Sequence, residues 1–235
     1  MGRIGKLIPN LSKAELFWHR LNLASDILNY ANKKRILRTE SLLSKNTSPT
    51  EDDSIPIFRT YYTKLIWEIM SNYPSLKKVT FIALTDAETY KFDRSSSIDD
   101  GEDSKRLGEL THYSKLKKTR LLKHIYHVVW ISYLLKDRAG GNIQGLLLLA
   151  LFHDFGKNEE IKSAYRSAEY RWHEEISANY ARSIMKSTGD FTSEYIDTIC
   201  SILATHHKFP QIGVLLYDLL SEADGAAREL EGSLF

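Results

Sequence analysis

An adjacent histidine and aspartate, His153 and Asp154, follow a strongly apolar run in this chain of 235 residues. The run covers residues 146–152, and the short sequence that carries the pair continues to Gly156 and Lys157. Burying an imidazole beside a carboxylate costs free energy unless something compensates, and a bound cation is the usual compensation. The pair therefore predicts a metal site in the interior of the protein.

Six of the eight histidines fall between positions 124 and 207. They occupy several predicted helices, where apolar neighbours turn their side chains inward: His124, His127, His153, His173, His206 and His207. A single buried histidine is more often a core residue than a ligand. Several histidines on facing helices, however, are how a helical bundle builds a metal site. His19 and His112 lie outside this region and are interpreted as surface or cap residues.

Imidazole and carboxylate ligands together suit first-row transition metals, so Mn, Fe, Co, Ni or Zn is expected, with Mg as a further candidate. An aspartate can bridge two ions, and two ions about 3.5–4 Å apart activate water and bind the oxygens of a phosphoester. Cys200 is the only cysteine and lies in an apolar pattern, so it is expected in the core and no structural zinc site is indicated. The predicted reaction is hydrolysis of a phosphate ester with one or two metal ions.

Apolar residues at helical spacing predict five helices joined by short connections in the second half of the chain. The predicted ranges are 116–136, 146–154, 172–186, 193–206 and 213–230. Gly140-Gly141 and Gly189 are placed to end the first and third of these helices. The predicted fold is therefore mainly α, with a helical bundle over residues 110–235.

Residues 1–109 are predicted to form an accessory region without catalytic spacing. Amphipathic patterns predict helices over 12–37 and 57–72, and polar composition predicts linkers over 38–56 and 93–108. The β-branched and aromatic run 79–84 predicts one strand of a small hairpin with residues 89–92.

The composition is that of a soluble globular protein, with 43% hydrophobic and 26% charged residues and a net charge of +2. A single cysteine fits a reducing compartment. The chain start lacks a secretory signal, and no apolar stretch reaches the ~18 residues of a membrane span. A cytoplasmic protein without membrane contact is expected.

The order of the candidate residues resembles the H…HD…H…HH…D signature of the HD-domain metal-dependent phosphohydrolase superfamily over about residues 115–231. It runs His124, His153-Asp154, His173, His206-His207 and Asp224. Residues 152–157 are similar to the LHDxGK element of that superfamily, and residues 219–228 are similar to the ending found in the ribonuclease Y branch. The resemblance implies an HD-domain helical bundle.

The resemblance also implies roles for individual residues. One metal would be held by His124, His153, Asp154 and Asp224. A second metal would be held by His173, His206 and His207, with Asp154 as the bridge. Asp154 and Lys157 would be catalytic, with Lys157 contacting the substrate phosphate.

Several alternatives to these roles stay open. His127, one helical turn after His124, is the alternative first ligand. Lys157 would otherwise be a lysine favoured at a helix C-terminus, and His173 an exposed cap. One member of the His206-His207 pair would otherwise orient the other.

Residues after His207 lack the DGxGYP sequence of cyclic-di-GMP phosphodiesterases, and the ending resembles ribonuclease Y or HD-type relaxases, which act on nucleic acid. A basic run precedes His124 and consists of Lys115, Lys117, Lys118, Arg120 and Lys123. Arg166 and Arg171, later in the chain, are further candidate basic contacts. The predicted function is a phosphodiesterase that acts on nucleotides or single-stranded nucleic acid through a metal-activated hydroxide. The alternatives are a non-catalytic metal-binding module with a regulatory or partner-binding role and a nucleotide monophosphatase.

Overall fold

The computed structural model describes residues 58–92, 119–165, 172–207 and 214–233 of the chain. Every regular element in these ranges is a helix, and no strand occurs within them. The predicted mainly α fold class is therefore confirmed for this part of the chain. The helix predicted over 12–37 and the linkers predicted over 38–56 and 93–108 lie outside the described residues.

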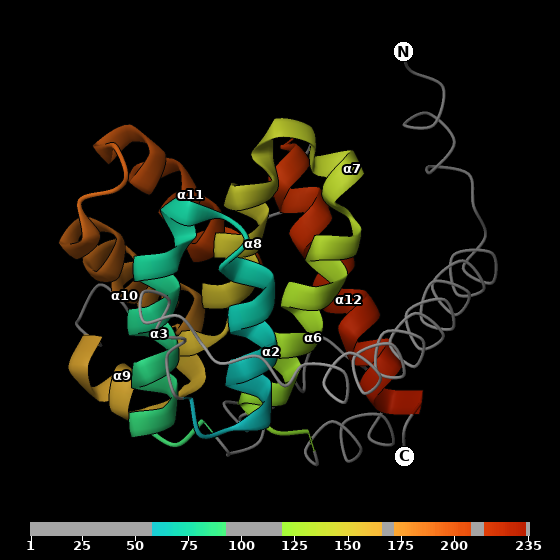
Figure 1. Cartoon of the computed structure of the whole chain (residues 1–235), viewed down its shortest axis with the longest axis horizontal. Helices are drawn as coiled ribbons and strands as arrows, with labels where there is room; N and C mark the ends of the chain where they lie inside the picture. The colour runs from blue at the N-terminus through green and yellow to red at the C-terminus, as the bar shows by residue number, and fades with distance from the viewer. Residues whose placement is uncertain (1–57, 93–118, 166–171, 208–213, 234–235) are drawn as a thin grey trace, which may run out of the picture. The chain divides into compact units, whose positions relative to one another are not determined.

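The first described helices are α2 (Tyr61–Met70) and α3 (Lys77–Thr89), joined by the short 3-10 helix η2 (Pro74–Leu76) (Figure 1). α2 lies inside the predicted range 57–72 and ends before Pro74, because a residue that precedes proline is disfavoured in helical conformation.

The predicted hairpin of residues 79–84 and 89–92 is wrong, because residues 79–89 belong to helix α3. Val79, Ala83 and Ala87 are all buried and lie four positions apart, which places them on one face of a helix. β-branched residues favour strands only weakly, and burying this helical face in the core outweighs that preference.

The next helices carry the first part of the predicted bundle. α6 (Leu121–Leu134) leads through α7 (Lys136–Ala139) and η3 (Gly140–Asn142) into α8 (Ile143–Phe152), which is followed by η4 (Phe155–Lys157) and α9 (Glu159–Tyr165). Gly140 has a φ of 56° at the end of α7, a conformation that glycine adopts readily. α8 ends at Phe152, so His153 and Asp154 lie just beyond the helix.

Three longer helices complete the described part: α10 (His173–Thr188), α11 (Ser193–Thr205) and α12 (Leu215–Ser233). Gly189 ends α10 in the left-handed conformation with a φ of 68°, as predicted. The Thr192 hydroxyl caps α11 by accepting the Tyr195 N–H at 3.3 Å. α12 continues past the predicted end at Leu230, which adds Glu231 to the helix.

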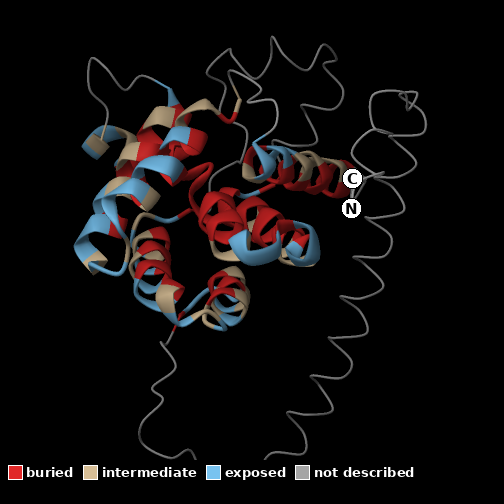
Figure 2. Ribbon diagram, turned by 90° about the horizontal axis from the view of Figure 1, so that it is seen from above, coloured by how far each residue is buried: buried red, intermediate tan, exposed pale blue. Residues whose placement is uncertain are grey.

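α8 is the central helix of the core. Its residues 145–152 are all buried, and it packs against α6, α10, α11 and α12. A helix that is apolar on every side must be enclosed by its neighbours. Figure 2 shows the same principle across the domain, with buried residues on the inward sides of the helices and exposed residues outside.

α2 and α3 pack onto these later helices, α2 against α6 and α3 against α10. Residues 56–235 form one compact unit. Glu88 on α3 secures the start of α2, since its Oε1 accepts the backbone N–H groups of Arg59 and Thr60 and the Thr63 hydroxyl at 2.8, 2.9 and 2.7 Å. The division into domains at residue 109 stays a prediction.

Candidate metal centre

The end of α8 places His153 and Asp154 in the interior, where both are fully buried, as predicted. The His153 N–H donates to the Leu149 carbonyl at 2.9 Å, and its Nδ1 lies 2.8 Å from the Ala150 carbonyl oxygen. A carbonyl oxygen only accepts hydrogen bonds, so Nδ1 carries the proton. Nε2 of the neutral ring is therefore left to bind a metal.

Gly156 lets the loop after Asp154 lie directly against the first turn of α10. Its N–H donates to the Ser177 hydroxyl at 2.8 Å. A Cβ atom at this position would collide with the His173 carbonyl group and lie 2.9 Å from the Ser177 nitrogen. Glycine is therefore required here by close packing, and this packing brings His173 beside Asp154.

α3 supports the same loop and the helix that faces it. Asn158, directly after η4, donates from Nδ2 to the Tyr90 carbonyl at 3.1 Å. The Tyr180 hydroxyl on α10 donates to Asp86 Oδ2 at 2.7 Å. Residues before position 109 thus help to hold the elements that carry the candidate ligands.

A first group of candidate ligands consists of His124 on α6, His153 after α8 and Asp224 on α12. One donor atom from each lies within 4.8 Å of the others. His124 Nε2 is 3.0 Å from Asp224 Oδ1 and 3.3 Å from His153 Nε2. We call these three residues the first group.

A second group of candidate ligands consists of Asp154, His173 at the start of α10, and His206 and His207 at the end of α11. Their donor atoms also lie within 4.8 Å of one another. His206 Nδ1 lies 2.6 Å from the Leu203 carbonyl oxygen, which fixes the proton on Nδ1 and leaves Nε2 for the group. We call these four residues the second group.

Four buried atoms of the second group find no hydrogen-bond partner among the described residues. They are Asp154 Oδ1 and the Nε2 atoms of His173, His206 and His207. A buried polar atom without a partner costs about 1–3 kcal/mol, so four in one place call for an explanation. All four are donor types that bind divalent transition metals, and the second group therefore fits a cation.

Asp154 belongs to the second group, and its other carboxylate oxygen faces the first group. Its Oδ2 is 3.5 Å from the Nε2 atoms of both His124 and His153, whereas its Oδ1 is 3.5 Å from His173 Nε2. This is the arrangement that a carboxylate bridging two metal ions needs. The structure thus brings together all seven residues predicted as ligands.

Two cationic side chains also reach the centre. Lys157 Nζ is buried 2.9 Å from Asp154 Oδ2, and Arg228 Nε lies 3.2 Å from Asp224 Oδ1. Burial would raise the pKa of Asp154, yet Lys157 and His153 hold it well below its usual range. Arg228 and His124 likewise overcome burial and lower the pKa of Asp224. Both carboxylates are therefore ionised, as metal ligands must be.

The histidines of the second group are neutral at pH 7. Burial and the nearby Lys157 charge hold the pKa of His173 well below its usual range. Burial, together with His153, lowers the pKa of His206 to about 4, and burial with His206 lowers the pKa of His207. Neutral imidazoles can bind a metal without first losing a proton.

The pKa of His124, in the first group, is shifted in the opposite direction. Burial disfavours its charged form, but Glu231 and Asp224 more than offset this and raise the pKa of His124 to about 9. The ring therefore carries an extra proton at pH 7, and a metal ion bound to Nε2 must displace it.

Glu231 and Glu174 are buried carboxylates that the sequence prediction missed. Glu231 Oε1 lies 3.1 Å from His124 Nδ1 and 2.8 Å from His127 Nδ1, and Glu174 Oε2 lies 3.4 Å from His173 Nδ1. His127 thus faces Glu231 rather than either ligand group, whereas His124 lies in the first group. The spacing of seven positions from Asp224 to Glu231, two helical turns, could have indicated Glu231.

The predicted basic run is only partly described. Arg120 is exposed immediately before α6, and Lys123 is half-buried in its first turn. The remaining members, Lys115, Lys117, Lys118, Arg166 and Arg171, lie outside the described residues. Contact with nucleic acid stays a prediction.

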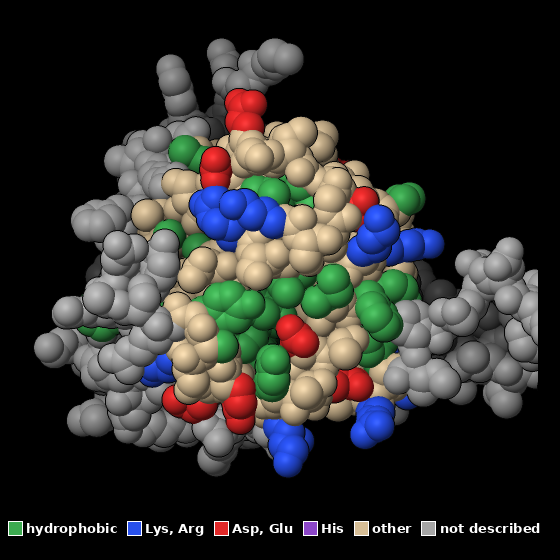
Figure 3. Space-filling view, turned by 90° about the vertical axis from the view of Figure 1, so that its left-hand side faces the viewer, with side chains coloured by type: hydrophobic (Ala, Val, Ile, Leu, Met, Phe, Trp, Pro, Cys, Tyr) green, Lys and Arg blue, Asp and Glu red, His purple; other side chains and the backbone are tan. Residues whose placement is uncertain are grey.

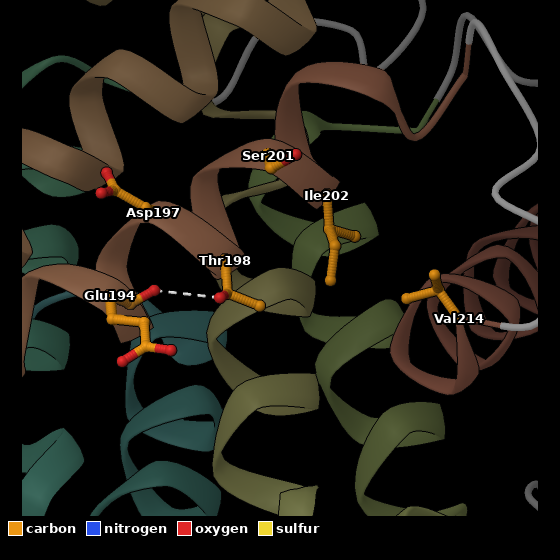
Figure 4. Close-up of a pocket in the computed structure, with 6 residues that line it drawn as sticks. All are labelled: Glu194, Asp197, Thr198, Ser201, Ile202 and Val214. Atoms are coloured by element: carbon orange, nitrogen blue, oxygen red, sulfur yellow. Dashed lines mark hydrogen bonds between the residues drawn. The ribbon is translucent and has the colours of Figure 1, made fainter.

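One surface hollow and one face of the molecule contain none of the candidate ligands among the described residues. An open hollow on α11 is lined by Glu194, Asp197, Thr198, Ser201, Ile202 and Val214 (Figure 4). The Thr198 hydroxyl there donates to the Glu194 carbonyl at 2.9 Å, and none of the lining residues is a candidate ligand. On the face drawn in Figure 3, no histidine side chain is visible among the described residues, in keeping with the burial of the ligand groups.

The described helices bring histidines and aspartates together from α6, α10 and α12 and from the ends of α8 and α11, an arrangement typical of helical bundles with a metal centre. Residues 121–232 match the family model described as HD domain, and this match supports the resemblance to the HD-domain superfamily of metal-dependent phosphohydrolases. No curated protein and no solved structure matches the chain. Among the described residues, no helix is both long enough and apolar enough to span a membrane.

Proposed function

We propose that the chain is a divalent-metal-dependent phosphohydrolase, and specifically a phosphodiesterase that acts on nucleotides or single-stranded nucleic acid. The observation that carries this proposal is the set of four partnerless donor atoms in the second group, next to a first group whose two histidines lie 3.5 Å from Asp154 Oδ2. The match of residues 121–232 to the HD-domain family model supports the reaction class.

Divalent cations in the two groups would activate a water molecule and stabilise the negative charge that develops on the phosphoryl oxygens. The residues of the chain prepare the site for this. Hydrogen bonds at Nδ1 orient His153 and His206, and Asp154 offers one oxygen to each group. Lys157 keeps Asp154 ionised and provides a positive charge that a substrate phosphate would meet.

A nucleotide or nucleic-acid substrate is supported by cations near the centre. Arg228 is partly exposed, with 17% of its side chain accessible, and its Nη2 lies 3.9 Å from Asp154 Oδ2. Arg120 is exposed at the start of the helix that carries His124. Guanidinium groups in such positions bind phosphate oxygens well.

The reaction class is tested by turnover of a substrate panel by the metal-loaded protein. The panel contains nucleoside monophosphates, cyclic dinucleotides, and short single-stranded RNA and DNA, and the variants are Asp154→Ala and the exposed control Asp137→Ala. We expect turnover of a phosphodiester that falls at least about 10²-fold in Asp154→Ala alone. No turnover of any member by the wild type would favour a non-catalytic metal-binding module instead. Turnover that survives Asp154→Ala would reject the site assignment.

The substrate class is tested by binding of a single-stranded oligonucleotide at increasing salt. Each phosphate contact adds roughly −0.7 to the slope of log affinity against log salt, so charge reversal at Lys117 and Lys118 should flatten the dependence. Binding that is insensitive to both salt and charge reversal would remove the nucleic-acid assignment. Turnover of nucleoside monophosphates alone would identify a monophosphatase.

A further inference from the structure

Glu231 is a buried carboxylate that contacts two histidines of α6 and belongs to neither ligand group. It is 1% exposed and lies on α12, two helical turns after Asp224. Its Oε1 is 3.1 Å from His124 Nδ1 and 2.8 Å from His127 Nδ1, and its Oε2 is 3.2 Å from His124 Nδ1. The contact therefore reaches the ring nitrogen of His124 that faces away from the first group.

The chemistry of this contact fixes which nitrogen of His124 can bind a metal. An ionised carboxylate only accepts hydrogen bonds, so His124 Nδ1 must be the donor. Nε2 is then the nitrogen whose lone pair a metal ion can use, and Nε2 is the atom that lies 3.0 Å from Asp224 Oδ1 and 3.3 Å from His153 Nε2. A carboxylate behind a histidine ligand also makes the imidazole a stronger ligand.

His127 holds the same carboxylate from a second direction. Its ring lies one helical turn after His124 on α6, and its Nδ1 donates to the oxygen that also accepts from His124. Two donors from one helix restrict the carboxylate to one orientation. A carboxylate held in this way can in turn hold the His124 ring.

Two carboxylates of α12 therefore contact His124 in the first group. Asp224 faces Nε2 of His124, while Glu231 faces Nδ1 of the same ring, so both sides of the imidazole contact a single helix. A small rotation of α12 would move both carboxylates together with respect to α6.

We propose that Glu231 is a positioning residue for the first metal, with His127 as the side chain that keeps Glu231 in place. The proposal rests on the proposed function only in taking the first group as a metal site. His127, which was the alternative first ligand predicted from the sequence, is thus assigned a supporting role instead.

The test measures Co²⁺ affinity of each group by visible absorption. A His207→Ala background reports the first group, and a His124→Ala background reports the second. At the high-pH plateau of Co²⁺ affinity, we expect Glu231→Ala to weaken binding at the first group about 10–100-fold and to leave binding at the second group within about twofold. Glu231→Gln should retain more affinity than Glu231→Ala, because its amide oxygen still accepts from both histidines. Glu222→Gln, a surface ion-pair residue of the same helix, is the matched control.

A second signature comes from NMR spectra of the zinc-loaded protein. The His124 Nδ1 proton should be visible in the wild type, because Glu231 protects it, and lost to solvent exchange in Glu231→Ala. If Glu231→Ala fails to fold, as judged by circular dichroism, Glu231→Leu and His127→Ala decide, because neither keeps the hydrogen bonds between Glu231 and both histidines. Unchanged first-group affinity in both would overturn the proposal.

Other outcomes separate this proposal from the proposed function. Metal binding by the wild type with unaltered first-group affinity in Glu231→Ala overturns the positioning role alone. Equal weakening of both groups also overturns it, because it would indicate a general loss of structure. Absence of metal binding by the wild type would remove both the proposed function and this role.

Discussion

The two ligand groups meet the cost of burial in different ways. In the first group, the rings and carboxylates bond to one another and to Glu231 and Arg228. In the second group, Asp154 Oδ1 and three imidazole nitrogens have no hydrogen-bond partner within the described part of the chain. The polar atoms of the first group thus find partners within the protein, whereas a bound cation would be the partner of these four atoms in the second group.

This difference gives the two groups different protonation states at pH 7. His124 holds a proton because Glu231 and Asp224 outweigh burial and raise its pKa to about 9, whereas burial lowers the pKa of His206 to about 4. The second group is therefore prepared for a metal ion, while the first must exchange a proton for one. Asp154 is the one residue that joins them.

The largest effect should follow from removing the shared ligand. Asp154→Asn keeps the shape of the side chain but removes its charge, so metal affinity should fall at both groups and turnover should fall roughly 10³-fold. His207→Ala should weaken the second group alone. Mass spectrometry measures the metal content of each variant, and turnover is measured in parallel. Asp137→Asn is the control. Loss of affinity at only one group in Asp154→Asn would show that the carboxylate does not join them.

Metal affinity at the first group should depend on pH, whereas that at the second should not. Below a pKa of about 9 His124 is protonated, so a metal ion competes with one proton. First-group affinity should therefore rise about tenfold per pH unit, or roughly 100-fold from pH 7 to 9, and then level off. The second group should be unchanged over this range, because its His206 is already neutral above a pKa of about 4.

Titration calorimetry in buffers of different ionisation enthalpy measures this exchange directly. In His207→Ala, we expect the first group to release about one proton when it binds a metal ion. In His124→Ala, we expect the second group to release few protons when it binds a metal ion. Equal pH slopes for the two groups would contradict the contrast between them.

Gly156→Ala should damage the second group more than the first. The new Cβ would collide with the His173 carbonyl and push α10 away from Asp154. We expect roughly 2 kcal/mol of destabilisation together with weaker metal binding at the second group. Gly141→Ala is the matched control, because a Cβ there meets nothing within 4 Å and φ is not positive. Urea denaturation compares the two, and similar small losses would mean that the loop can move without cost.

The smallest effect should come from the support that α3 gives to α10. Tyr180→Phe removes the hydroxyl that donates to Asp86 at 2.7 Å, and should lower the free energy of unfolding by about 1 kcal/mol. Tyr165→Phe removes only a weak exposed contact of 3.5 Å to Ser183 and serves as control. Equal melting temperatures for the two variants would show that this bond does not stabilise α10.

Local rules were sufficient for the features that one segment determines. The apolar run before His153 predicted burial of the pair, and Gly189 predicted the end of α10. Gly140-Gly141 was predicted to end one helix over 116–136, but this stretch holds α6 and the short α7, and Gly140 ends α7. In each case the cause, either continuous hydrophobicity or a glycine with positive φ, lies within a few residues.

Features that depend on distant segments were not predicted. Residues 79–84 look like a strand locally, but their buried positions follow helical spacing once α3 packs into the core. Glu231 was missed because the predicted helix stopped at Leu230, and its partners His124 and His127 lie about a hundred positions earlier. The partnerless atoms of the second group are likewise visible only when three segments are folded together.

The most direct test of the two-group centre is an anomalous difference map from crystals grown with Mn²⁺. The account predicts two peaks about 3.5–4 Å apart on either side of Asp154. One peak should contact His124, His153 and Asp224, and the other His173, His206 and His207. A single peak, or peaks away from Asp154, would contradict the account.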